Sequence, residues 1–394
     1  MNRPRVLHLV NSIGPTSIPL EIAEHIGRDQ FDIVVLSYYD SNKEVALKKT
    51  NNNTKIIGIG ARGKADIRAI FRLYRKMRRI APDVLHTHHN LSGSLGRLFA
   101  KCLKVPVIVD TEHSVPSRNL RYTFGASLLN GLTLGFADAV VFNSNATRTS
   151  LPQWIACFVK PERERVIYNG VDIGRIESNL RRDLSAGCPL SEWVSKEQFV
   201  ICNVGSLRPV KNQATLIEAL ELIRREAHDV KLVIVGGGPL EEELRKEIAE
   251  RNLTSAVWLA GEVCRDMVYR ILHACDVFVM TSLWEGFCVA VVEAMAARKP
   301  IIMTEVGALP EVVGSAGVFV PPRDPEAVAQ AVLRIKNYPS EAEQIAKAAE
   351  QRGRELFPLE KTVTAYEDLY QELLMRKQHP RMHSAYEDSK KTNE

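Results

Sequence analysis

The sequence predicts an α/β protein of two Rossmann-like, doubly wound domains that face each other across a cleft. Short apolar runs alternate with helical patterns nearly throughout the 394 residues, as in parallel strands that are covered on both faces. The alternation stops at 173–198 and then starts again. The chain is 45% apolar, and its length exceeds what one domain usually needs.

The first domain is predicted over residues 1–172, where apolar runs such as RVLHLV indicate strands between amphipathic segments. The expected strands are 5–10, 31–37, 55–59, 83–88, 106–113, 139–144 and 164–170. The expected helices are 18–26, 65–80, 92–102 and 121–135.

The second domain is predicted over residues 199–355, after a linker or lead-in at 173–198. Its expected strands are 199–206, 230–238, 256–261, 276–282, 300–304 and 317–322. Its expected helices are 212–226, 240–251, 265–273, one from about 287, and 325–336. A helix within 356–376 is expected to pack back on the first domain, and the polar tail 377–394 to be disordered.

Composition excludes several classes of protein. A net charge of +5 is too small to indicate nucleic acid as a main partner. The seven cysteines show no C-x-x-C spacing, which argues against a disulfide scaffold or structural zinc. No apolar run reaches the roughly 18 residues of a membrane span, and the first run is too short for a signal peptide. A cytoplasmic location is expected.

The run GIGARG at 58–63 matches the dinucleotide fingerprint G-x-G-x-x-G between a strand and a helix. That fingerprint needs an acidic residue at the end of the next strand, where it meets a ribose. Asp83 stands at the right distance but precedes its strand, and the match lies at the third strand. A glycine-rich turn is therefore favoured over NAD binding.

Cations and glycines gather at strand ends of the second domain. In VGSLRPVKN, Gly205 ends a strand and precedes Arg208 and Lys211, two cations suited to phosphate oxygens. In VGGGPL, Gly237 belongs to a turn that lets a ligand approach the backbone. Solvated loop cations are the alternative interpretation of Arg208 and Lys211.

The stretch LWEGFCVAVVEAMA places Glu285 and Glu293 eight positions apart. On one helix this spacing spans about 12 Å, more than the roughly 5–9.5 Å between carboxylates that share one glycosidic bond. The two side chains are therefore expected to contact two places on one long ligand. A helix cap and a solvated helix residue are the alternative.

Gly286 allows a tight entry into the helix that follows Glu285. Free N–H groups from Phe287 to Val289 are expected there and would attract an anion. A diphosphate on this helix start, clamped by Arg208 and Lys211, would leave one glutamate for each end of a nucleotide sugar.

These segments resemble one family. EGFCVAVVE matches the E-x7-E motif of the retaining glycosyltransferases of family 4, which have the two-domain GT-B fold. The resemblance covers roughly residues 5–375 and includes DVLHTHH, TEHS, NSNATRTSL, VIYNGVD, VGSLRPVKN, VGGGPL, LAGEV and EGFCVAVVEAMAARKPIIMTEVGALPEVV.

The resemblance implies a role for each matching position. Glu285 would contact the hydroxyls of the donor sugar and Glu293 those of the ribose, while Lys211 and Arg208 neutralise the leaving diphosphate. His113 would lie near the reacting sugar. The implied catalytic residues are His113, Arg208, Lys211 and Glu285. The implied nucleotide-sugar contacts are Gly14, Gly205, Gly237, Val263, Gly286, Phe287, Cys288, Val289 and Glu293.

The sequence also departs from the family pattern. The family usually has arginine directly after the glycine equivalent to Gly205, where this chain has Ser206. Whether Arg208 takes the place of that arginine is open. The first loop, GPTSIP at 14–19, lacks the usual Gly-Gly pair followed by Glu.

The three histidines His88, His89 and His113 raise the possibility of a metal site. No D-x-D pair lies nearby, and the resemblance implies protein cations in place of a metal. We therefore expect neither a metal nor a cofactor, and read His113 as a hydrogen-bond donor.

The predicted function is metal-independent, retaining transfer of a sugar from a UDP- or GDP-sugar to a hydroxyl of a glycan or lipid-linked acceptor. Cell-surface polysaccharide or glycolipid synthesis would use such an enzyme. The alternatives are an epimerase or hydrolase of the same fold, or a non-catalytic sugar-nucleotide-binding protein.

The basic segment 64–80, KADIRAIFRLYRKMRRI, combines an apolar stripe at helical spacing with six Arg and Lys residues from Arg68 onward. The expected stripe is Ile67, Ile70, Phe71, Tyr74 and Met77. Such a helix either packs on the core with a solvated cationic face or lies on an anionic membrane. The second interpretation predicts peripheral contact at the inner face of the membrane.

Overall fold

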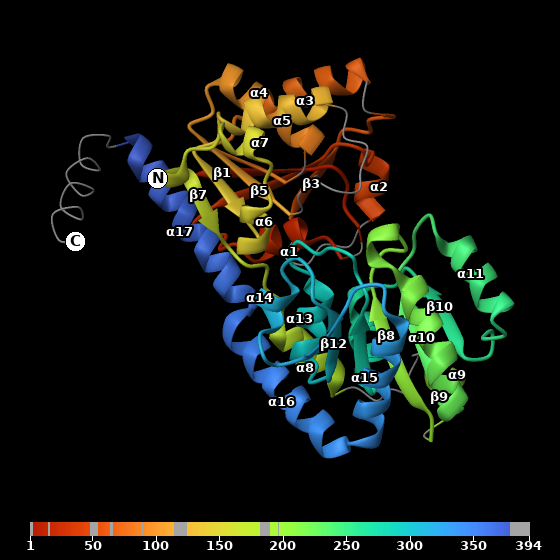
Figure 1. Ribbon diagram of the computed structural model, residues 1–394. Helices are drawn as coiled ribbons and strands as arrows, with labels where there is room; N and C mark the ends of the chain where they lie inside the picture. The colour runs from red at the N-terminus through yellow and green to blue at the C-terminus, as the bar shows by residue number, and fades with distance from the viewer. Residues whose placement is uncertain are drawn as a thin grey trace, which may run out of the picture. The chain divides into compact units, whose positions relative to one another are not determined.

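The computed structural model describes residues 3–14, 16–47, 54–63, 66–88, 90–113, 124–181, 190–195 and 197–378. The chain divides into two compact units. Unit 1 comprises Met1–Tyr168 and Glu360–Glu394, and unit 2 comprises Asn169–Leu359. Each unit contains a parallel sheet with helices packed against it (Figure 1). The predicted class, two doubly wound α/β domains, is confirmed.

The sheet of unit 1 has the strand order β3-β2-β1-β4-β5-β6-β7, and every pairing is parallel. Its strands are β1 (Arg5–Val10), β2 (Asp32–Ser37), β3 (Lys55–Gly58), β4 (Val84–Thr87), β5 (Val107–Glu112), β6 (Ala139–Phe142) and β7 (Glu164–Val166). The order reverses between β1 and β4, so the carboxyl ends of these two strands flank the crevice where such sheets bind ligands.

In the described part of unit 1 the helices match the predicted positions closely. They are α1 (Ile18–His25), α2 (Asn42–Leu47), α3 (Ile67–Ile80), α4 (Asn90–Leu103), α5 (Phe124–Leu134), α6 (Asn145–Thr149), α7 (Gln153–Ala156), η2 (Pro161–Arg163) and α17 (Leu359–Gln378). Four short ones, α2, α6, α7 and η2, are not predicted by the sequence pattern. Tyr370 on α17 is fully buried and contacts His86 of β4, so α17 completes the core of unit 1.

Helix α3 begins at an N-cap, because the Asp66 carboxylate accepts from the N–H of Ala69 at 3.0 Å. Its buried residues are Ala69, Leu73 and Met77. The expected stripe is therefore partly wrong: only Met77 of its members is buried, and Ile67 and Phe71 point to solvent. The small Ala69, not a large apolar residue, faces the core because it lies one turn before Leu73.

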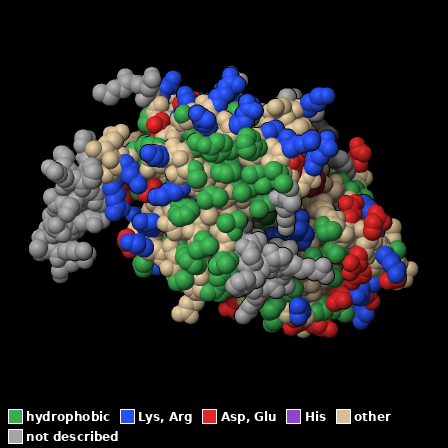
Figure 2. Space-filling view, turned by 90° about the horizontal axis from the view of Figure 1, so that it is seen from above, with side chains coloured by type: hydrophobic (Ala, Val, Ile, Leu, Met, Phe, Trp, Pro, Cys, Tyr) green, Lys and Arg blue, Asp and Glu red, His purple; other side chains and the backbone are tan. Residues whose placement is uncertain are grey.

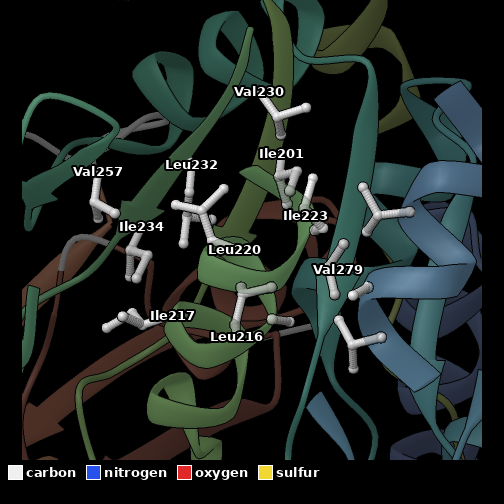
Figure 3. Close-up of a cluster of buried hydrophobic side chains, with 14 of the residues drawn as sticks. Ile201, Leu216, Ile217, Leu220, Ile223, Val230, Leu232, Ile234, Val257 and Val279 are labelled. Carbon is white, nitrogen blue, oxygen red and sulfur yellow. The ribbon is translucent and has the colours of Figure 1, made fainter. Parts of the chain in front are cut away.

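The sheet of unit 2 has the strand order β10-β9-β8-β11-β12-β13 and is also parallel. Its strands are β8 (Phe199–Val204), β9 (Val230–Val235), β10 (Val257–Gly261), β11 (Val277–Met280), β12 (Ile301–Thr304) and β13 (Val318–Val320). Apolar side chains of β8, β9 and β11 pack against α10 in one buried cluster, which includes Ile201, Leu220 and Leu232 (Figure 3).

The helices of unit 2 are α8 (Ile173–Leu180), α9 (Leu190–Trp193), η3 (Pro209–Lys211), α10 (Gln213–Glu226), α11 (Glu241–Glu250), α12 (Arg265–Ala274), α13 (Val289–Ala296), α14 (Leu309–Val313), α15 (Pro325–Asn337) and α16 (Pro339–Leu356). None of the helices in the described ranges is both long enough and apolar enough to cross a membrane.

The segment 173–198 differs from the expected linker. It contains α8, which is capped by Asp172, and α9. Helix α8 belongs to unit 2, because Arg175 pairs with Asp266 of α12 at 2.7 Å and Ile176 is buried. The sequence pattern does not predict α8, because the helix is mostly polar and only Ile176 and Asn179 are buried. Within the expected tail, Lys377 and Gln378 are still in α17, and 379–394 lie outside the described residues.

Candidate functional site

A buried ion pair joins two neighbouring strand ends in unit 2. The Nζ atom of Lys211, the last residue of η3, lies 2.6 Å from Oε1 of Glu285. The hydroxyl of Ser282 donates to the same oxygen at 2.6 Å. Lys211 follows β8 and Glu285 follows β11, the two strands at which the sheet order reverses. The pair therefore occupies the position where doubly wound sheets bind ligands.

Lys211 stays protonated in this largely buried position. The side chains of Lys211 and Glu285 are 18% and 9% exposed. Burial is the largest single influence and lowers the pKa of Lys211, but the charge of Glu285, the neighbouring Cys288 and the hydrogen bond to Glu285 together raise this pKa well above its ordinary value. Lysine has three N–H donors, so Lys211 can hold Glu285 and still donate to an anion.

The backbone around Glu285 is fixed by the end of β12. The N–H of Ala308 donates to the carbonyl of Glu285 at 3.0 Å, and the Thr304 hydroxyl donates to the carbonyl of Ser282 at 2.6 Å. Gly307 has φ +53°, and a Cβ there would overlap the Glu285 carbonyl. A glycine is therefore required for the close approach that positions Glu285.

The glycine-rich turns after β8 and β9 pack against each other. Gly236 has φ +134°, and a Cβ there would overlap the carbonyl of Gly205. The N–H of Leu207 donates to the carbonyl of Gly237 at 2.9 Å. The side chain of Lys211 crosses Gly205, where a Cβ would lie 3.5 Å from it. These contacts hold the loop that carries Lys211 close to the sheet.

Glu293 is buried on α13 and is held by two residues of α12. Tyr269 donates through its hydroxyl to Oε1 of Glu293 at 3.3 Å, and Nε of Arg265 lies 3.5 Å from the same oxygen. Arg265 and Tyr269 are one helical turn apart, so one face of α12 positions the carboxylate. The sequence interpretation missed both residues, although their i, i+4 spacing after the LAGEV loop was visible.

Helix α13 begins at Val289, two residues later than expected. Cys288 precedes it with φ +68°, an uncommon conformation for a residue with a side chain. Glu285 therefore lies in the loop before the helix, and Glu293 lies within it. Burial first, and then the charge of Glu285, raise the pKa of Cys288 to about 12, so its thiol is protonated. Phe287 anchors the loop by packing edge-on against Phe357.

Two other expected contacts in unit 2, Arg208 and Val263, lie on the loops that follow β8 and β10. Arg208 is exposed at the start of η3, and its guanidinium makes no hydrogen bond or ion pair with the described residues. Ser206 is also exposed. Val263 is half-buried in the loop between β10 and α12, next to the exposed Glu262.

His113 and Gly14 belong to unit 1. Gly14 is exposed in the loop between β1 and α1. His113 directly follows β5, and its Nε2 lies 3.2 Å from Nδ1 of His88. His88 follows β4, and its Nε2 lies 3.0 Å from Nδ1 of His8 on β1. The sequence interpretation did not include His8, because it stands inside an apolar strand.

His8, His86 and His88 are close enough together to suggest a metal site, with ligand atoms within 4.8 Å of one another. Hydrogen bonds to other protein groups occupy most of the ring nitrogens, which argues against a metal site. His86 contacts the Tyr370 hydroxyl at 2.6 Å and the Thr111 hydroxyl at 2.7 Å. Five of the six ring nitrogens in this cluster therefore have protein partners. His89 lies outside the described residues.

Asp83 has a structural role at the edge of β4. Its Oδ2 accepts from the backbone N–H of Arg5 at 2.7 Å. This bond ties β4 to β1 and supports the interpretation of 58–63 as a glycine-rich turn, in which Gly60 has φ +68°.

Two family models match the chain, one in each half. The model described as "Glycosyltransferase Family 4" matches residues 16–175. The model described as "Glycosyl transferases group 1" matches residues 191–352. Between them they cover most of the residues that form both sheets.

Curated relatives match parts of the chain. UDP-Gal:α-D-GlcNAc-diphosphoundecaprenol α-1,3-galactosyltransferase of Escherichia coli is 29% identical over 61% of this chain. The match spans 62% of that relative's length. Glycogen synthase of Mycobacterium tuberculosis is 28% identical over 79% of this chain and 74% of its own.

The fold also matches solved structures. Anabaena HepE, solved in complex with UDP and glucose, superimposes with a TM-score of 0.79 at 20% identity. The match covers 94% of this chain and all of HepE. At this identity the likeness concerns the fold alone.

Proposed function

Since this chain belongs to glycosyltransferase family 4 and has the GT-B fold, we propose that it transfers a sugar from a nucleoside diphosphate sugar to a hydroxyl group. The observation that carries this proposal is the buried Lys211–Glu285 pair at the carboxyl ends of β8 and β11. A cation and a carboxylate placed together there suit a ligand that has a phosphate beside a hydroxyl-rich sugar.

Each charged group takes one part of the donor. Lys211, Arg208 and the start of α13 bind the diphosphate, and Glu285 accepts from the hydroxyls of the sugar. Glu293, positioned by Arg265 and Tyr269, accepts from the ribose hydroxyls. The backbone near Gly205, Gly237 and Val263 contacts the nucleotide. The family resemblance also assigns His113 and Gly14 to the donor.

The proposed reaction retains the anomeric configuration. The bond between the anomeric carbon and the phosphate oxygen breaks, and a bond to the acceptor oxygen forms on the same face. The acceptor proton passes to the departing phosphate. Lys211 and Arg208 stabilise the charge that develops on this leaving group, which is usually the largest catalytic contribution of such sites. Neither a metal nor a cofactor is assigned a role.

We propose a UDP-sugar as the donor. The name of the Escherichia coli relative contains UDP-Gal, and HepE was solved with UDP. The name of the Escherichia coli relative gives an acceptor linked to diphosphoundecaprenol, whereas the Mycobacterium tuberculosis relative is a glycogen synthase. We propose a lipid-linked or glycan acceptor in the synthesis of cell-surface polysaccharide or glycolipid.

A two-step experiment tests the donor and the reaction. UDP-, GDP- and ADP-sugars are screened by thermal shift, because a ligand that binds only the native state raises its apparent stability. The donor that stabilises the protein is then incubated, in labelled form, with lipid diphosphate and oligosaccharide acceptors. We expect UDP-sugar binding and labelled product, and the Glu285→Ala variant is expected to lose transfer.

The alternatives predict other outcomes in the same assay. An epimerase or hydrolase would form an epimer or free sugar quantitatively without an acceptor. A non-catalytic binding protein would show the thermal shift and no turnover. Transfer at the wild-type rate by Glu285→Ala would disprove the role of Glu285.

We further propose that one helical face of unit 1 binds an anionic lipid bilayer. The sequences of α3, α4, α5 and α7, which pack in this order, contain no Asp or Glu. Helix α3 alone contributes six Arg and Lys residues. Six of the large hydrophobic residues that are exposed lie on these helices or directly after α5, namely Ile67, Phe71, Leu98, Leu132, Phe136 and Trp154.

Figure 2 shows hydrophobic side chains gathered over α3, α4 and α5, with Lys and Arg side chains around them. Ile67 and Phe71 are 77% and 67% exposed. Apolar side chains bordered by cations, on helices whose own sequences contain no acidic residue, complement the interface of a negatively charged membrane. A lipid-linked acceptor would be presented at such an interface.

The membrane proposal predicts binding to vesicles of anionic lipid at low salt. Replacing Ile67 and Phe71 together by serine is expected to weaken binding at least about tenfold, because each buried apolar side chain contributes about 1.5–3 kcal/mol. Co-sedimentation with phosphatidylglycerol vesicles measures this effect. The control is Tyr338→Ser with Leu356→Ser, two exposed residues of unit 2. Equal binding by both double variants, or no binding by the wild type, would contradict the proposal.

A further inference from the structure

Three histidine rings form a continuous hydrogen-bonded row through unit 1. His8 on β1 and His88 after β4 are fully buried, and His113 after β5 is partly exposed. Nδ1 of His8 lies 3.0 Å from Nε2 of His88, and Nδ1 of His88 lies 3.2 Å from Nε2 of His113. The row therefore links the centre of the sheet to a residue that we assign to the donor sugar.

The direction of this row follows from counting protons. Three neutral imidazoles carry three ring protons. Each of the two contacts between rings needs one proton, because two facing lone pairs or two facing N–H groups would repel. The third proton must then lie at one end of the row, either on Nε2 of His8 or on Nδ1 of His113.

The His8 end is unsuited to a proton. Nε2 of His8 is buried and has no hydrogen-bond partner among the described residues. An N–H group at that position would be left without an acceptor. Orphaned buried N–H groups are rarer than under-satisfied acceptors in protein backbones, and we apply the same ordering to this ring nitrogen. Burial also lowers the pKa of His8 to about 3, so this ring holds a single proton. That proton lies on Nδ1 and is donated to His88.

We propose that His8 and His88 are positioning residues that fix His113 as the tautomer with its proton on Nδ1. His8 donates to His88, His88 donates to Nε2 of His113, and the proton of His113 is therefore confined to Nδ1. The tautomer of a histidine is set by the hydrogen bond that its other nitrogen makes. Here that bond comes from a buried ring whose own direction is fixed.

This tautomer restricts what His113 can do. Its Nε2 lone pair is occupied by His88, so His113 offers an N–H donor through Nδ1 and no free base. Such a group acts as a hydrogen-bond donor and cannot take the proton of an acceptor hydroxyl. This consequence for catalysis rests on the proposed function, whereas the tautomer itself does not.

His86 provides a matched control within the same cluster. Its ring centroid lies 3.9 Å from that of His88 and 5.0 Å from that of His8, and it is equally buried. Both of its nitrogens bond to hydroxyl groups of Tyr370 and Thr111, outside the row. A substitution of His86 therefore disturbs the same core without removing a member of the row.

The test is long-range ¹H–¹⁵N NMR of the full chain labelled at histidine, at pH 8, above the ordinary imidazole pKa of about 6.5. A His113→Gln variant identifies the signals of His113. We expect Nδ1 of His113 to be protonated and Nε2 to be unprotonated in the wild type. In His8→Phe the signals are expected to shift toward the other tautomer, and in His86→Phe they are expected to remain unchanged.

The wild-type spectrum is decisive even if a variant does not fold. A proton on Nε2 of His113 would overturn the proposal. So would an unchanged His113 tautomer in folded His8→Phe protein. None of these readouts requires turnover, so failure of the transfer assay leaves the tautomer test intact. A fixed Nδ1–H tautomer without transfer activity would refute the proposed function alone.

Discussion

Replacing Lys211 by methionine is expected to reduce kcat for sugar transfer by about 100- to 1000-fold, the usual effect of removing one electrostatic donor from a transition state. The same change is expected to destabilise unit 2 by about 3–5 kcal/mol, because it leaves the buried carboxylate of Glu285 without its cation. Initial rates and urea unfolding measure the two effects.

A double variant separates catalysis from stability. Lys211→Met combined with Glu285→Gln removes both charges, so no uncompensated buried charge remains and most of the lost stability should return. Activity should not return, because the phosphate still lacks its cation. Arg208→Met is the control for the loop: Arg208 is exposed and has no described partner, so unfolding should change by less than about 0.5 kcal/mol.

Two outcomes would contradict this assignment. The first is a Lys211→Met variant with wild-type kcat and unchanged affinity for the donor. The second is a double variant that is no more stable than Lys211→Met, which would show that the charge of Glu285 is not the source of the destabilisation. If Lys211→Met instead loses activity but keeps its full stability, Lys211 acts in catalysis and its ion pair with Glu285 does not stabilise unit 2.

The positions of Lys211 and Glu285 illustrate what the sequence can predict. Both follow short apolar runs, so their location at the carboxyl ends of parallel strands follows from the alternation alone. The alternation does not predict that β8 and β11 are neighbours, because the order of strands in a sheet depends on packing between segments more than 70 residues apart. The resemblance to family 4 predicts that Lys211 and Glu285 lie near the same ligand, and the structure adds the 2.6 Å contact between Nζ of Lys211 and Oε1 of Glu285.

Residues that hold the site in place were harder to find. Gly307 resembles any turn glycine until its closeness to the Glu285 carbonyl is known. Cys288 gives no sequence signal of its left-handed conformation, which is why α13 begins later than predicted. His8 is hidden because a buried strand shows no period of two that would distinguish a functional side chain from a packed one.

A second polar cluster lies directly before His113 on β5. Arg97 of α4 is fully buried and pairs with Asp110. It also donates to Asn130 of α5 at 2.6 Å, and Asn130 in turn donates to Glu112 at 3.1 Å. One buried guanidinium thus faces two carboxyl groups. Burial, and then the charge of Asp110, raise the pKa of Glu112 to about 7.

This raised pKa predicts that unit 1 becomes less stable as the pH rises from about 4.5 to about 7. In this range the unfolded chain has released the proton of Glu112, whose ordinary pKa is 4.5, while the folded chain still binds it. Stability falls wherever the folded state binds more protons than the unfolded state. At about 1.4 kcal/mol for each pKa unit, the total loss is about 3 kcal/mol.

Glu112→Gln is therefore expected to remove this slope, so that the stability difference between variant and wild type grows in favour of the variant from pH 4.5 to 7 and is constant above it. Urea unfolding measures the difference, and hydrogen exchange of β5 and β6 follows unit 1 separately from unit 2. For the control Glu162→Gln, at an exposed position of unit 1, the curve of unfolding free energy against pH should run parallel to that of the wild type. A Glu112→Gln curve that also runs parallel would mean that Glu112 is ionised beside Asp110 in the folded protein, and that Arg97 compensates both carboxylates.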